Sequence, residues 1–538
     1  MKLIFNARIH TLNSAQPTAS ALLVDRGEIL AVGGDELLDS RAEKIDIGGR
    51  VVLPGLTDAH IHLQYYSLGL QKIDCETTSL ADCLRRVDER VKNTKHGEWI
   101  LGHGWNQNEW GELNLRALSE LRGESSWPSA SDLDALTTSH PIYLTAKSLH
   151  AAWVNSAALK LAGITASTPN PENGEIQRDA HGQPTGILLE SAMSLVSDII
   201  PQPSFDAVMD AVRSAQPILW KMGLTGVHDF DRSFCFMVLQ ELHKRGELKL
   251  RVTKNLPVDD LDHAREVGLR SGFGDDFLRI GNVKAFMDGA LGPHTAAMFQ
   301  PYLNDGENRG ILNMDGEHLF EIARRAADGG LGMTVHAIGD RANHEVLNAY
   351  EQLRRYEREH GLPALRHRIE HVQIIHPDDA ARLAQLNVIA SMQPIHAPSD
   401  MYAAEKFWGS DRVPFSYAWR TQLTHGATLA FGSDAPVESP NPFWGLHAAV
   451  TRRRADGSPS PSGWIPEQKL SMPEALAAYT LGPAYAAGTE SRVGRLAPGY
   501  LADLIVVEND PLTCPPDDLL AMQSSATMVD GEWVWRSE

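Results

Sequence analysis

The sequence predicts an α/β protein: a (β/α)8 TIM barrel with a small accessory β-sandwich domain made from both chain ends and an inserted α+β subdomain after the first barrel strand. Three observations support this fold class. Eight short apolar segments alternate with segments of helical composition in the middle of the chain. Both ends alternate apolar and polar residues at period two. A long segment with strand signals of its own separates the first two barrel strands.

Residues 1–56 and 487–538 are predicted to form the accessory β-sandwich domain. At the amino-terminal end, strand-like segments such as "ASALLVDRGEILAVGG" are separated by turn residues such as Arg26-Gly27. The carboxyl-terminal end has the same texture in "VGRLAPGYLADLIVV" and "SATMVDGEWVWR". Period-two alternation is typical of antiparallel sheets with one solvated face, so one domain built from both ends is the simplest interpretation.

Residues 57–486 are predicted to form the barrel domain. Buried parallel strands appear as short apolar runs, and eight of them close a barrel whose reactive groups lie at the carboxyl ends of the strands. The strand candidates are segments 57–63, 223–230, 248–255, 282–288, 332–339, 367–373, 387–393 and 427–434.

This set of eight requires that residues 68–205, approximately, form the inserted subdomain. The segments "EWILGHGWNQ" and "PIYLTAKSLH" carry strand signals of their own. The stretch 167–186, which contains several proline and glycine residues, predicts a hairpin or a loop.

The composition is that of an ordinary globular protein, with 538 residues, 43% of them hydrophobic and 22% charged. A formal net charge of -20 argues against nucleic acid or an anionic membrane as a partner. The four cysteines lack C-x-x-C spacing, which argues against a zinc ribbon or a disulfide framework. The first apolar run is too short for a signal-peptide core, and no window approaches the ~20 apolar residues of a membrane span. We therefore expect a cytoplasmic protein with a small-molecule substrate, for which a homodimer is a reasonable prior.

Two histidines, His60 and His62, lie two residues apart in the first strand candidate, so their side chains project from the same face. Neutral imidazoles bind Zn²⁺ and its neighbours in the transition series, and the pair could supply half of a metal site. The alternative is a pair of barrel-filling histidines that bond to backbone groups. The H-x-H pattern alone does not separate these interpretations.

Three further polar residues lie at comparable points of later strands. His336 and His371 are imidazoles inside otherwise apolar strands, and Asp434 follows the apolar run of the eighth candidate. A buried carboxylate must be paired, hydrogen-bonded or metal-bound. Taken singly, each histidine could be a core residue, and Asp434 could be a helix N-cap. Taken together, polar groups at the ends of four barrel strands indicate a functional site.

Lys284 lies inside the apolar segment "RIGNVKAFMDGALG", on the fourth strand candidate. An ammonium is costly to bury and would be repelled by a metal dication, so an inward-facing lysine should lose its proton. A neutral amine can take up CO2 to become a carbamate that bridges two cations, although spacing alone does not predict this. The alternative is a solvent-facing or ion-paired lysine, with Asp288 as a candidate partner.

The ordered set "DAHIH", "VKAFMDGALG", "VHAIGDRA", "RIEHVQ" and "FGSDAP" resembles the amidohydrolase superfamily of metal-dependent hydrolases. More closely, it is similar to the "amidohydrolase 3" branch, which contains N-substituted formamide deformylases. The resemblance covers nearly the whole chain, including "SLHAAWVNSAAL" and the closing "VGRLAPGYLADLIVV". It is specific for the superfamily and does not specify a substrate.

The resemblance implies one or two divalent metal ions, with Zn favoured and Mn, Fe or Co as alternatives. The implied ligands are His60, His62 and Asp434 for the first ion, His336 and His371 for the second, and Lys284, as a carbamate, for both. A metal-activated water would attack the substrate carbonyl. Asp434 would accept the proton of that water and return it to the leaving amine.

The resemblance also suggests side chains for substrate binding. These are Trp105, His150, Asn155, Asp288, His294 and Arg341. Core packing of the subdomain is an equal alternative for Trp105. The chain departs from the branch pattern at Leu149, where glycine is common, and at Pro293-His294, where Ser-Arg is common. If that arginine binds substrate in relatives, His294 would have to act instead as a neutral or switchable donor.

Three functional hypotheses follow. The first is a metal-dependent hydrolase that cleaves a non-peptide carbon–nitrogen bond, in an N-formyl or N-acyl amine, with deamination or cyclic-amide opening as the nearest rival. The second is a catalytically silent protein of the same fold with a regulatory role, which missing ligands would indicate, and none is missing. The third, a serine hydrolase or a phosphate-handling enzyme, is disfavoured because G-x-S-x-G, P-loop and H-E-x-x-H motifs are lacking.

Overall fold

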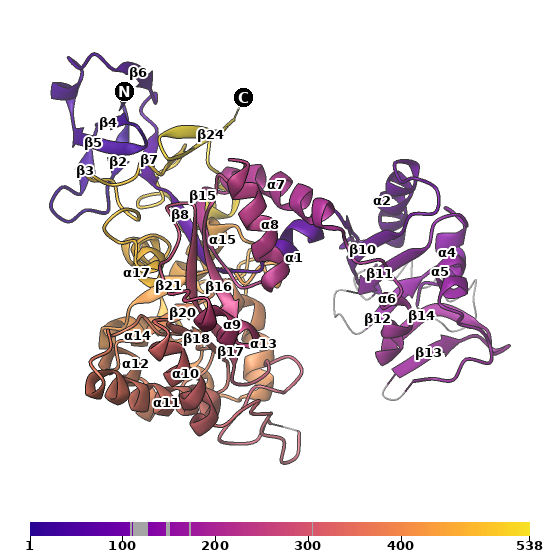
Figure 1. Cartoon of the computed structure of the whole chain (residues 1–538). Helices are drawn as coiled ribbons and strands as arrows, with labels where there is room; N and C mark the ends of the chain where they lie inside the picture. The colour runs from indigo at the N-terminus through magenta and orange to yellow at the C-terminus, as the bar shows by residue number, and fades with distance from the viewer. Residues whose placement is uncertain (108–109, 111–126, 147–150, 172–173, 304, 538) are drawn as a thin grey trace. The chain divides into compact units, whose positions relative to one another are not determined.

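The structure is a computed structural model that describes residues 1–107, 110, 127–146, 151–171, 174–303 and 305–537 (Figure 1). It divides the chain into two compact units. One consists of Met1–Ser67 together with Val208–Glu538, and the other consists of Leu68–Ala207. Each unit has sheets and an apolar core of its own.

A parallel sheet of eight strands lies in the first unit, in the order β21-β20-β19-β18-β17-β16-β15-β8. The strands are β8 (Leu56–Ile61), β15 (Leu224–Asp229), β16 (Arg251–Pro257), β17 (Leu278–Phe286), β18 (Met333–Ala337), β19 (Arg368–His371), β20 (Ile389–Met392) and β21 (Leu429–Phe431). Each strand overlaps one of the eight segments expected from the sequence, in chain order. The predicted α/β fold with an eight-stranded parallel sheet is therefore confirmed.

The two edges of this sheet meet just beyond β21. Ile61 forms a parallel bridge with Ala435, and the backbone N–H of Asp434 donates to the carbonyl oxygen of His60 at 2.7 Å. Gly432 permits this close approach, because a Cβ at that position would lie 2.4 Å from the backbone nitrogen of His60. The sheet is therefore a nearly closed barrel.

Two of the expected strands end earlier than the sequence pattern suggests. β8 ends at Ile61 and β21 ends at Phe431, so His62 and Asp434 lie immediately beyond the regular strands. The backbone explains the difference: Asp434 has a φ of 60°, in the left-handed region that interrupts a strand. The N–H of His62 bonds to the carbonyl oxygen of Ala435 at 2.9 Å.

Helices follow most barrel strands, as a parallel sheet requires for its connections. In this unit they are α1 (Leu63–Gly69), α7 (Phe205–Lys221), α8 (Ser233–Lys244), α9 (Leu261–Glu266), α10 (Gly316–Asp328), α11 (Asp340–Glu359), α12 (Arg382–Gln385), α13 (His396–Phe407), α14 (Trp419–His425), α15 (Pro442–Thr451), α16 (Met472–Ala478) and α17 (Leu481–Ala487). Within the described part of the chain, no helix combines the length and the apolar character needed to cross a membrane.

Both chain ends contribute strands to two further sheets. One has the order β5-β4-β1-β6 and the other the order β24-β23-β22-β7-β2-β3. The strands are β1 (Lys2–Phe5), β2 (Arg8–His10), β3 (Thr18–Ala19), β4 (Ala21–Asp25), β5 (Glu28–Gly33), β6 (Glu43–Asp46), β7 (Val51–Pro54), β22 (Leu504–Val507), β23 (Ala526–Val529) and β24 (Glu532–Arg536). β7 pairs with β22, and one apolar cluster joins residues of both sheets, among them Ile4, Leu22, Val52 and Leu504.

The second unit is built on a six-stranded sheet of order β13-β14-β12-β11-β10-β9. Its elements are β9 (Ile73–Asp74), α2 (Leu80–Lys92), β10 (Ile100–Trp105), α4 (Ala130–Asp134), β11 (Ile142–Ala146), β12 (Ala151–Val154), α5 (Ser156–Leu161), β13 (Gly174–Arg178), β14 (Pro184–Glu190) and α6 (Ser194–Ser197). β13 and β14 are antiparallel neighbours in the stretch for which the sequence predicts a hairpin or a loop. The core of this unit contains the buried indoles of Trp105, Trp110 and Trp153.

Candidate metal centre

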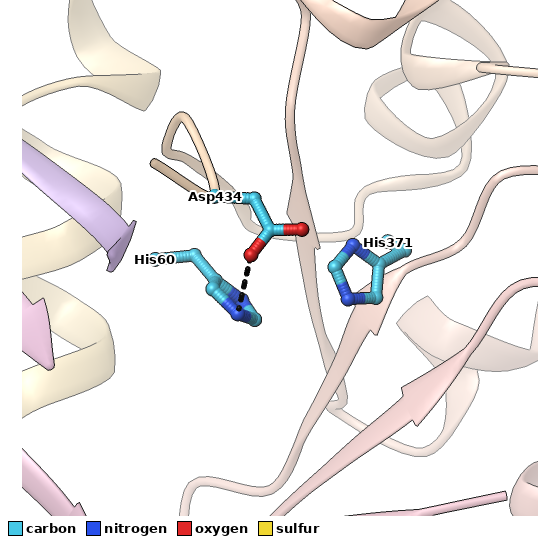
Figure 2. A group of neighbouring side chains, drawn as sticks. All are labelled: His60, His371 and Asp434. Carbon is cyan, nitrogen blue, oxygen red and sulfur yellow. Dashed lines mark ion pairs between the residues drawn. The ribbon is translucent and has the colours of Figure 1, made fainter. Parts of the chain in front are cut away.

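The side chains predicted as metal ligands gather at the carboxyl ends of the barrel strands. His60 and His62 come from the end of β8, and the others are Lys284 of β17, His336 of β18, His371 of β19 and Asp434 after β21. His60, His371 and Asp434 each offer a ligand atom within 4.8 Å of the others, so together they could hold an ion. Figure 2 shows the carboxylate of Asp434 between the two imidazoles, with its ion pair to His60.

His62 and His336 extend this group. Nε2 of His62 lies 3.4 Å from Oδ1 of Asp434, and Nε2 of His60 lies 3.5 Å from the same oxygen. The ring centroids of His60 and His371 are 5.0 Å apart, and those of His371 and His336 are 4.5 Å apart. The carboxylate therefore lies against the β8 histidines, and His371 connects them to His336.

In each of these four imidazoles, one ring nitrogen forms a hydrogen bond with another protein group. The pairs are His60 Nδ1 with Glu370 Oε2 (2.6 Å), His62 Nδ1 with Asp231 Oδ1 (3.3 Å), His371 Nδ1 with Gln393 Oε1 (2.8 Å) and His336 Nε2 with the Gly289 carbonyl oxygen (2.9 Å). All four partners are oxygen acceptors, so a neutral imidazole donates there and keeps a lone pair on its other nitrogen. Partners of this kind fix the tautomer of metal-binding histidines, so the donor set fits a divalent cation.

Lys284 is buried with its ammonium group among aromatic rings. Its Nζ lies 4.6 Å from the ring centroid of Phe230 and 4.9 Å from that of Phe286. Within the described residues Lys284 has neither an ion pair nor a hydrogen bond. Burial lowers the pKa of Lys284 to about 8, and the negative charges of Glu370 and Asp434 oppose this shift only in part. The neutral amine that a carbamate requires is therefore accessible near neutral pH.

Two site residues have a backbone conformation that residues with a side chain rarely adopt. His371 has a φ of 77° and Asp434 has a φ of 60°. The alternation of a regular strand would place Glu370 and His371 on opposite faces of β19, yet both reach the barrel interior. Left-handed residues of this kind persist where the surrounding structure holds them, and they are common at functional sites.

The charge states of the site suit cation binding at most positions. Burial and the nearby charge of Lys284 lower the pKa of His60 and of His336 to about 4. Burial alone would raise the pKa of Asp434, but His60 and His62 outweigh it and hold that pKa well below its usual range. His62 differs: burial opposes its protonation, but the carboxylates of Asp231 and Asp434 raise its pKa to about 9. A cation at this position would take the place of that proton.

A buried carboxylate ties β8 to the turn that carries Asp434. Asp58 accepts hydrogen bonds from the backbone N–H groups of His60 and Ser433, both at 3.0 Å, and from the hydroxyl of Ser433 at 2.5 Å. Burial raises the pKa of Asp58 to about 7, although these hydrogen bonds oppose the shift. Asp58 therefore fixes the relative position of two site residues on opposite edges of the barrel sheet.

A second group of potential ligand atoms belongs to Asp229, Asp231 and Cys235. Lys254 already occupies it: Nζ donates to Oδ2 of Asp229 at 2.5 Å and to the carbonyl oxygen of Asp231. The ammonium offsets the charge of the Asp229 carboxylate, which a metal ion would otherwise bind. This group is therefore a buried ion pair that supports the hydrogen bond between Asp231 and His62.

Two of the residues suggested for substrate binding lie in the core of the second unit. The fully buried Trp105 donates from Nε1 to the carbonyl oxygen of Leu144 at 2.9 Å. The buried Asn155 caps α5, accepting from the N–H of Ala158 at 3.1 Å, and donates to the carbonyl oxygen of His140 at 2.9 Å. Both side chains thus stabilise the fold of the second unit.

The other suggested substrate residues have varied surroundings. Asp288 is buried and accepts three hydrogen bonds from backbone N–H groups, at 2.8 to 3.0 Å, so it is not the ion-pair partner of Lys284. Nδ1 of His294 lies 2.8 Å from Oδ2 of Asp305. Arg341 is exposed in the first turn of α11. His150 lies outside the described residues.

The sequence interpretation missed the partners that orient the imidazoles. Asp231 follows the second barrel strand, so the position rule that singled out Asp434 applies to it as well. Glu370 precedes His371 inside an apolar strand, where a carboxylate needs a partner. Gln393 carries no charge and gave no signal of this kind.

Comparisons with known proteins identify the family of the chain. Residues 43–535 match the model of the amidohydrolase family. The chain is 33% identical to the protein LONG AFTER FAR-RED 3 of Arabidopsis thaliana over 94% of this chain and 87% of that one. It is 29% identical to the N-substituted formamide deformylase of Arthrobacter pascens over 98% and 97%. An uncharacterized metal-dependent hydrolase from Pyrococcus horikoshii has a similar structure, with a TM-score of 0.77 and 27% identity over 96% of this chain and 99% of that one. The chain therefore belongs to the amidohydrolase family.

Proposed function

We propose that the protein is a metal-dependent hydrolase that cleaves the carbon–nitrogen bond of a non-peptide amide, with an N-formyl or N-acyl amine as its substrate. The observation that carries the proposal is the convergence of four imidazoles, each with one nitrogen left for a cation, around an ionised carboxylate. Imidazole and carboxylate ligands suit Zn²⁺, with Mn²⁺, Fe²⁺ and Co²⁺ as alternatives.

The side chains divide the work of the reaction. His60, His62 and Asp434 would hold one ion, His336 and His371 a second, and Lys284, as a carbamate, would contact both. When bound, such ions activate water and polarise a carbonyl group. Asp434 is ionised and accepts a proton during attack, then returns it to the nitrogen of the leaving amine. That proton return makes an amine a good leaving group, which is the main chemical demand of amide hydrolysis.

The substrate class is supported by the similarity to a formamide deformylase along nearly the whole chain. An N-formyl or N-acyl amine presents one carbonyl and one nitrogen. A bound cation would polarise the carbonyl, and the neighbouring carboxylate would transfer a proton to the nitrogen. The loops that follow the barrel strands would select the groups attached to that amide.

Purification without chelators, elemental analysis and a substrate screen test the proposal. We expect bound Zn, Mn, Fe or Co and turnover of formyl-amines or acyl-amines, lost on chelation and restored by metal. The screen includes cyclic amides and esters, so a different substrate class would be recognised. Protein that holds no metal after gentle purification, or turnover that survives chelation, would contradict the proposal.

A matched pair of histidine variants makes this test specific. His371→Gln should lower metal content and turnover by at least about a hundredfold, since metal polarisation is worth several kcal/mol. His447, which is equally buried, pairs with Asp517 in another part of the first unit, at 3.2 Å. His447→Gln should therefore keep its metal, and equal loss in both variants would show an effect on folding alone.

A further inference from the structure

A polar layer lies inside the barrel beside the candidate metal centre, and Glu370 is its central residue. Glu370 is fully buried, and Oε2 accepts the hydrogen bond from Nδ1 of His60 at 2.6 Å. Oε1 accepts a hydrogen bond from the hydroxyl of Thr334 on β18. Arg368, two residues earlier on β19, places Nε 2.9 Å from Oε1 and Nη2 3.2 Å from Oε2. Both oxygens of the carboxylate are therefore held on two sides.

Arg368 is in turn fixed by three other barrel strands. Nη1 lies 2.8 Å from Nδ1 of His228 on β15. Nη2 donates to the carbonyl oxygen of Ala59 on β8 at 2.8 Å and to the hydroxyl of Ser391 on β20 at 2.7 Å. A buried ion pair is tolerated when hydrogen bonds satisfy its other polar groups, and here β8, β15 and β20 supply partners for both terminal nitrogens of Arg368. Glu370 is thus rigidly placed opposite His60.

We infer that Glu370, held by Arg368, is a positioning residue that fixes the tautomer and the ring orientation of His60 for cation binding. This inference rests on the proposed metal-dependent function. Because the carboxylate accepts the bond, Nδ1 of His60 is the donor and Nε2 retains its lone pair. Nε2 is the nitrogen that lies 3.5 Å from Oδ1 of Asp434, on the side where the other candidate ligands converge. The negative charge of the partner also raises the basicity of the imidazole as a ligand.

The chain contains a matched control for this arrangement. Glu357 is also a buried glutamate that pairs with one arginine and one histidine: Oε2 accepts from Nη1 of Arg354 at 2.8 Å, and Oε1 lies 2.9 Å from Nε2 of His367. Nδ1 of His367 already accepts the backbone N–H of Met333 at 3.0 Å, so this imidazole has no nitrogen for a metal. Replacing Glu357 therefore removes a similar carboxylate without touching the metal centre.

Glu370→Gln and Glu357→Gln are compared in two measurements on the full chain. Competition with a chelator gives the zinc dissociation constant, and denaturant unfolding of the metal-free protein gives the loss of stability. Glu370→Gln should weaken zinc binding by 10- to 100-fold, as loss of such a partner does in other metal sites. Glu357→Gln should lose stability but bind zinc as tightly as the original protein.

Equal zinc affinity in the two variants would overturn the positioning role, while a wild-type protein that binds no metal would instead refute the proposed function. A milder variant covers the case in which Glu370→Gln does not fold. Thr334→Val removes one hydrogen bond to Oε1 and leaves Glu370 and His60 in place. It should weaken zinc binding about fivefold, which corresponds to one ordinary hydrogen bond. Unchanged zinc affinity in Thr334→Val would contradict the inference.

Discussion

Two buried lysines on neighbouring barrel strands show how the surroundings of an amine determine its charge state. Lys254 on β16 donates to Asp229 at 2.5 Å, and this pairing outweighs burial and raises its pKa. Lys284 on β17 has no such partner among the described residues, and burial lowers its pKa. Only an uncharged amine reacts with CO2, so Lys284 is the one of the two that can become a carbamate. The same residue type is a fixed cation at one position and a reactive group at the other.

The carbamate leads to a prediction at Lys284. With labelled bicarbonate, carbon-13 NMR should show one carbamate signal in the wild-type protein and none in Lys284→Ala. Metal content should fall, and turnover should drop by roughly a hundredfold or more, because a bridging ligand is lost. Small carboxylates should restore part of both, since they can occupy the vacated volume. A signal that persists in Lys284→Ala would assign the modification to another lysine.

Asp434 carries a second prediction at the residue scale. Asp434→Asn keeps the shape of the side chain but removes the negative charge of the carboxylate. In the wild type, His60 and His62 keep the pKa of this carboxyl low, so it is ionised. Turnover should fall by about 10²- to 10⁴-fold, the usual contribution of a general acid–base group, while metal content falls less. Steady-state kinetics at measured metal occupancy separates the two effects. Turnover per bound metal that equals the wild-type value would remove Asp434 from the proton transfer.

At the scale of elements, the sequence predicted all eight barrel strands because strands buried on both faces are recognisable as short apolar runs. It could not predict which residues form hydrogen bonds with the candidate metal ligands. Glu370 and His60 are separated by more than 300 residues and meet only because β19 and β8 belong to one nearly closed barrel. The sequence also could not predict that His371 points to the same side of β19 as Glu370. This orientation follows from a φ of 77°, which the surrounding structure imposes on a residue with a side chain.

Asp58 bonds to both β8 and the turn after β21, so we expect it to stabilise the closure of the barrel. Asp58→Ala would leave buried donors of His60 and Ser433 without an acceptor, at a cost of about 1–3 kcal/mol for each orphaned group. Asp58→Asn retains one acceptor oxygen and should cost less. Denaturant unfolding of the metal-free variants measures both losses. If Asp58→Ala and Asp58→Asn were equally stable, the hydrogen bonds of Asp58 would not be what closes the barrel.

The raised pKa of Asp58 also predicts a pH dependence. The folded state favours the neutral carboxyl, with a pKa of about 7 against 3.8 for the ordinary group. Its contribution to stability is therefore fully present below about pH 4 and is lost as the pH rises towards 7. The stability of the metal-free wild type relative to Asp58→Asn should fall over this interval by up to about 4 kcal/mol. A constant difference across the interval would show that Asp58 titrates normally.

For the whole molecule, the important feature is that the first unit, called the barrel unit, and the second unit (Leu68–Ala207), called the inserted unit, each have sheets and a core of their own. Four indoles, those of Trp105, Trp110, Trp127 and Trp153, pack together in the inserted unit. The candidate metal ligands all belong to the other unit. Metal binding should therefore stabilise one unit directly, since a ligand stabilises only the structure that binds it.

This separation predicts two unfolding transitions in scanning calorimetry. Chelation should lower the midpoint of one transition and leave the other unchanged. Leu144→Ala, in the core of the inserted unit, and Leu347→Ala, in α11, each remove a fully buried leucine at a cost of about 2–5 kcal/mol. Leu144→Ala should shift only the transition that chelation leaves unchanged, and Leu347→Ala only the metal-sensitive one. If both substitutions and chelation instead shift a single common transition, the two units fold as one cooperative structure, and the inserted unit would then take part in the stability of the metal centre.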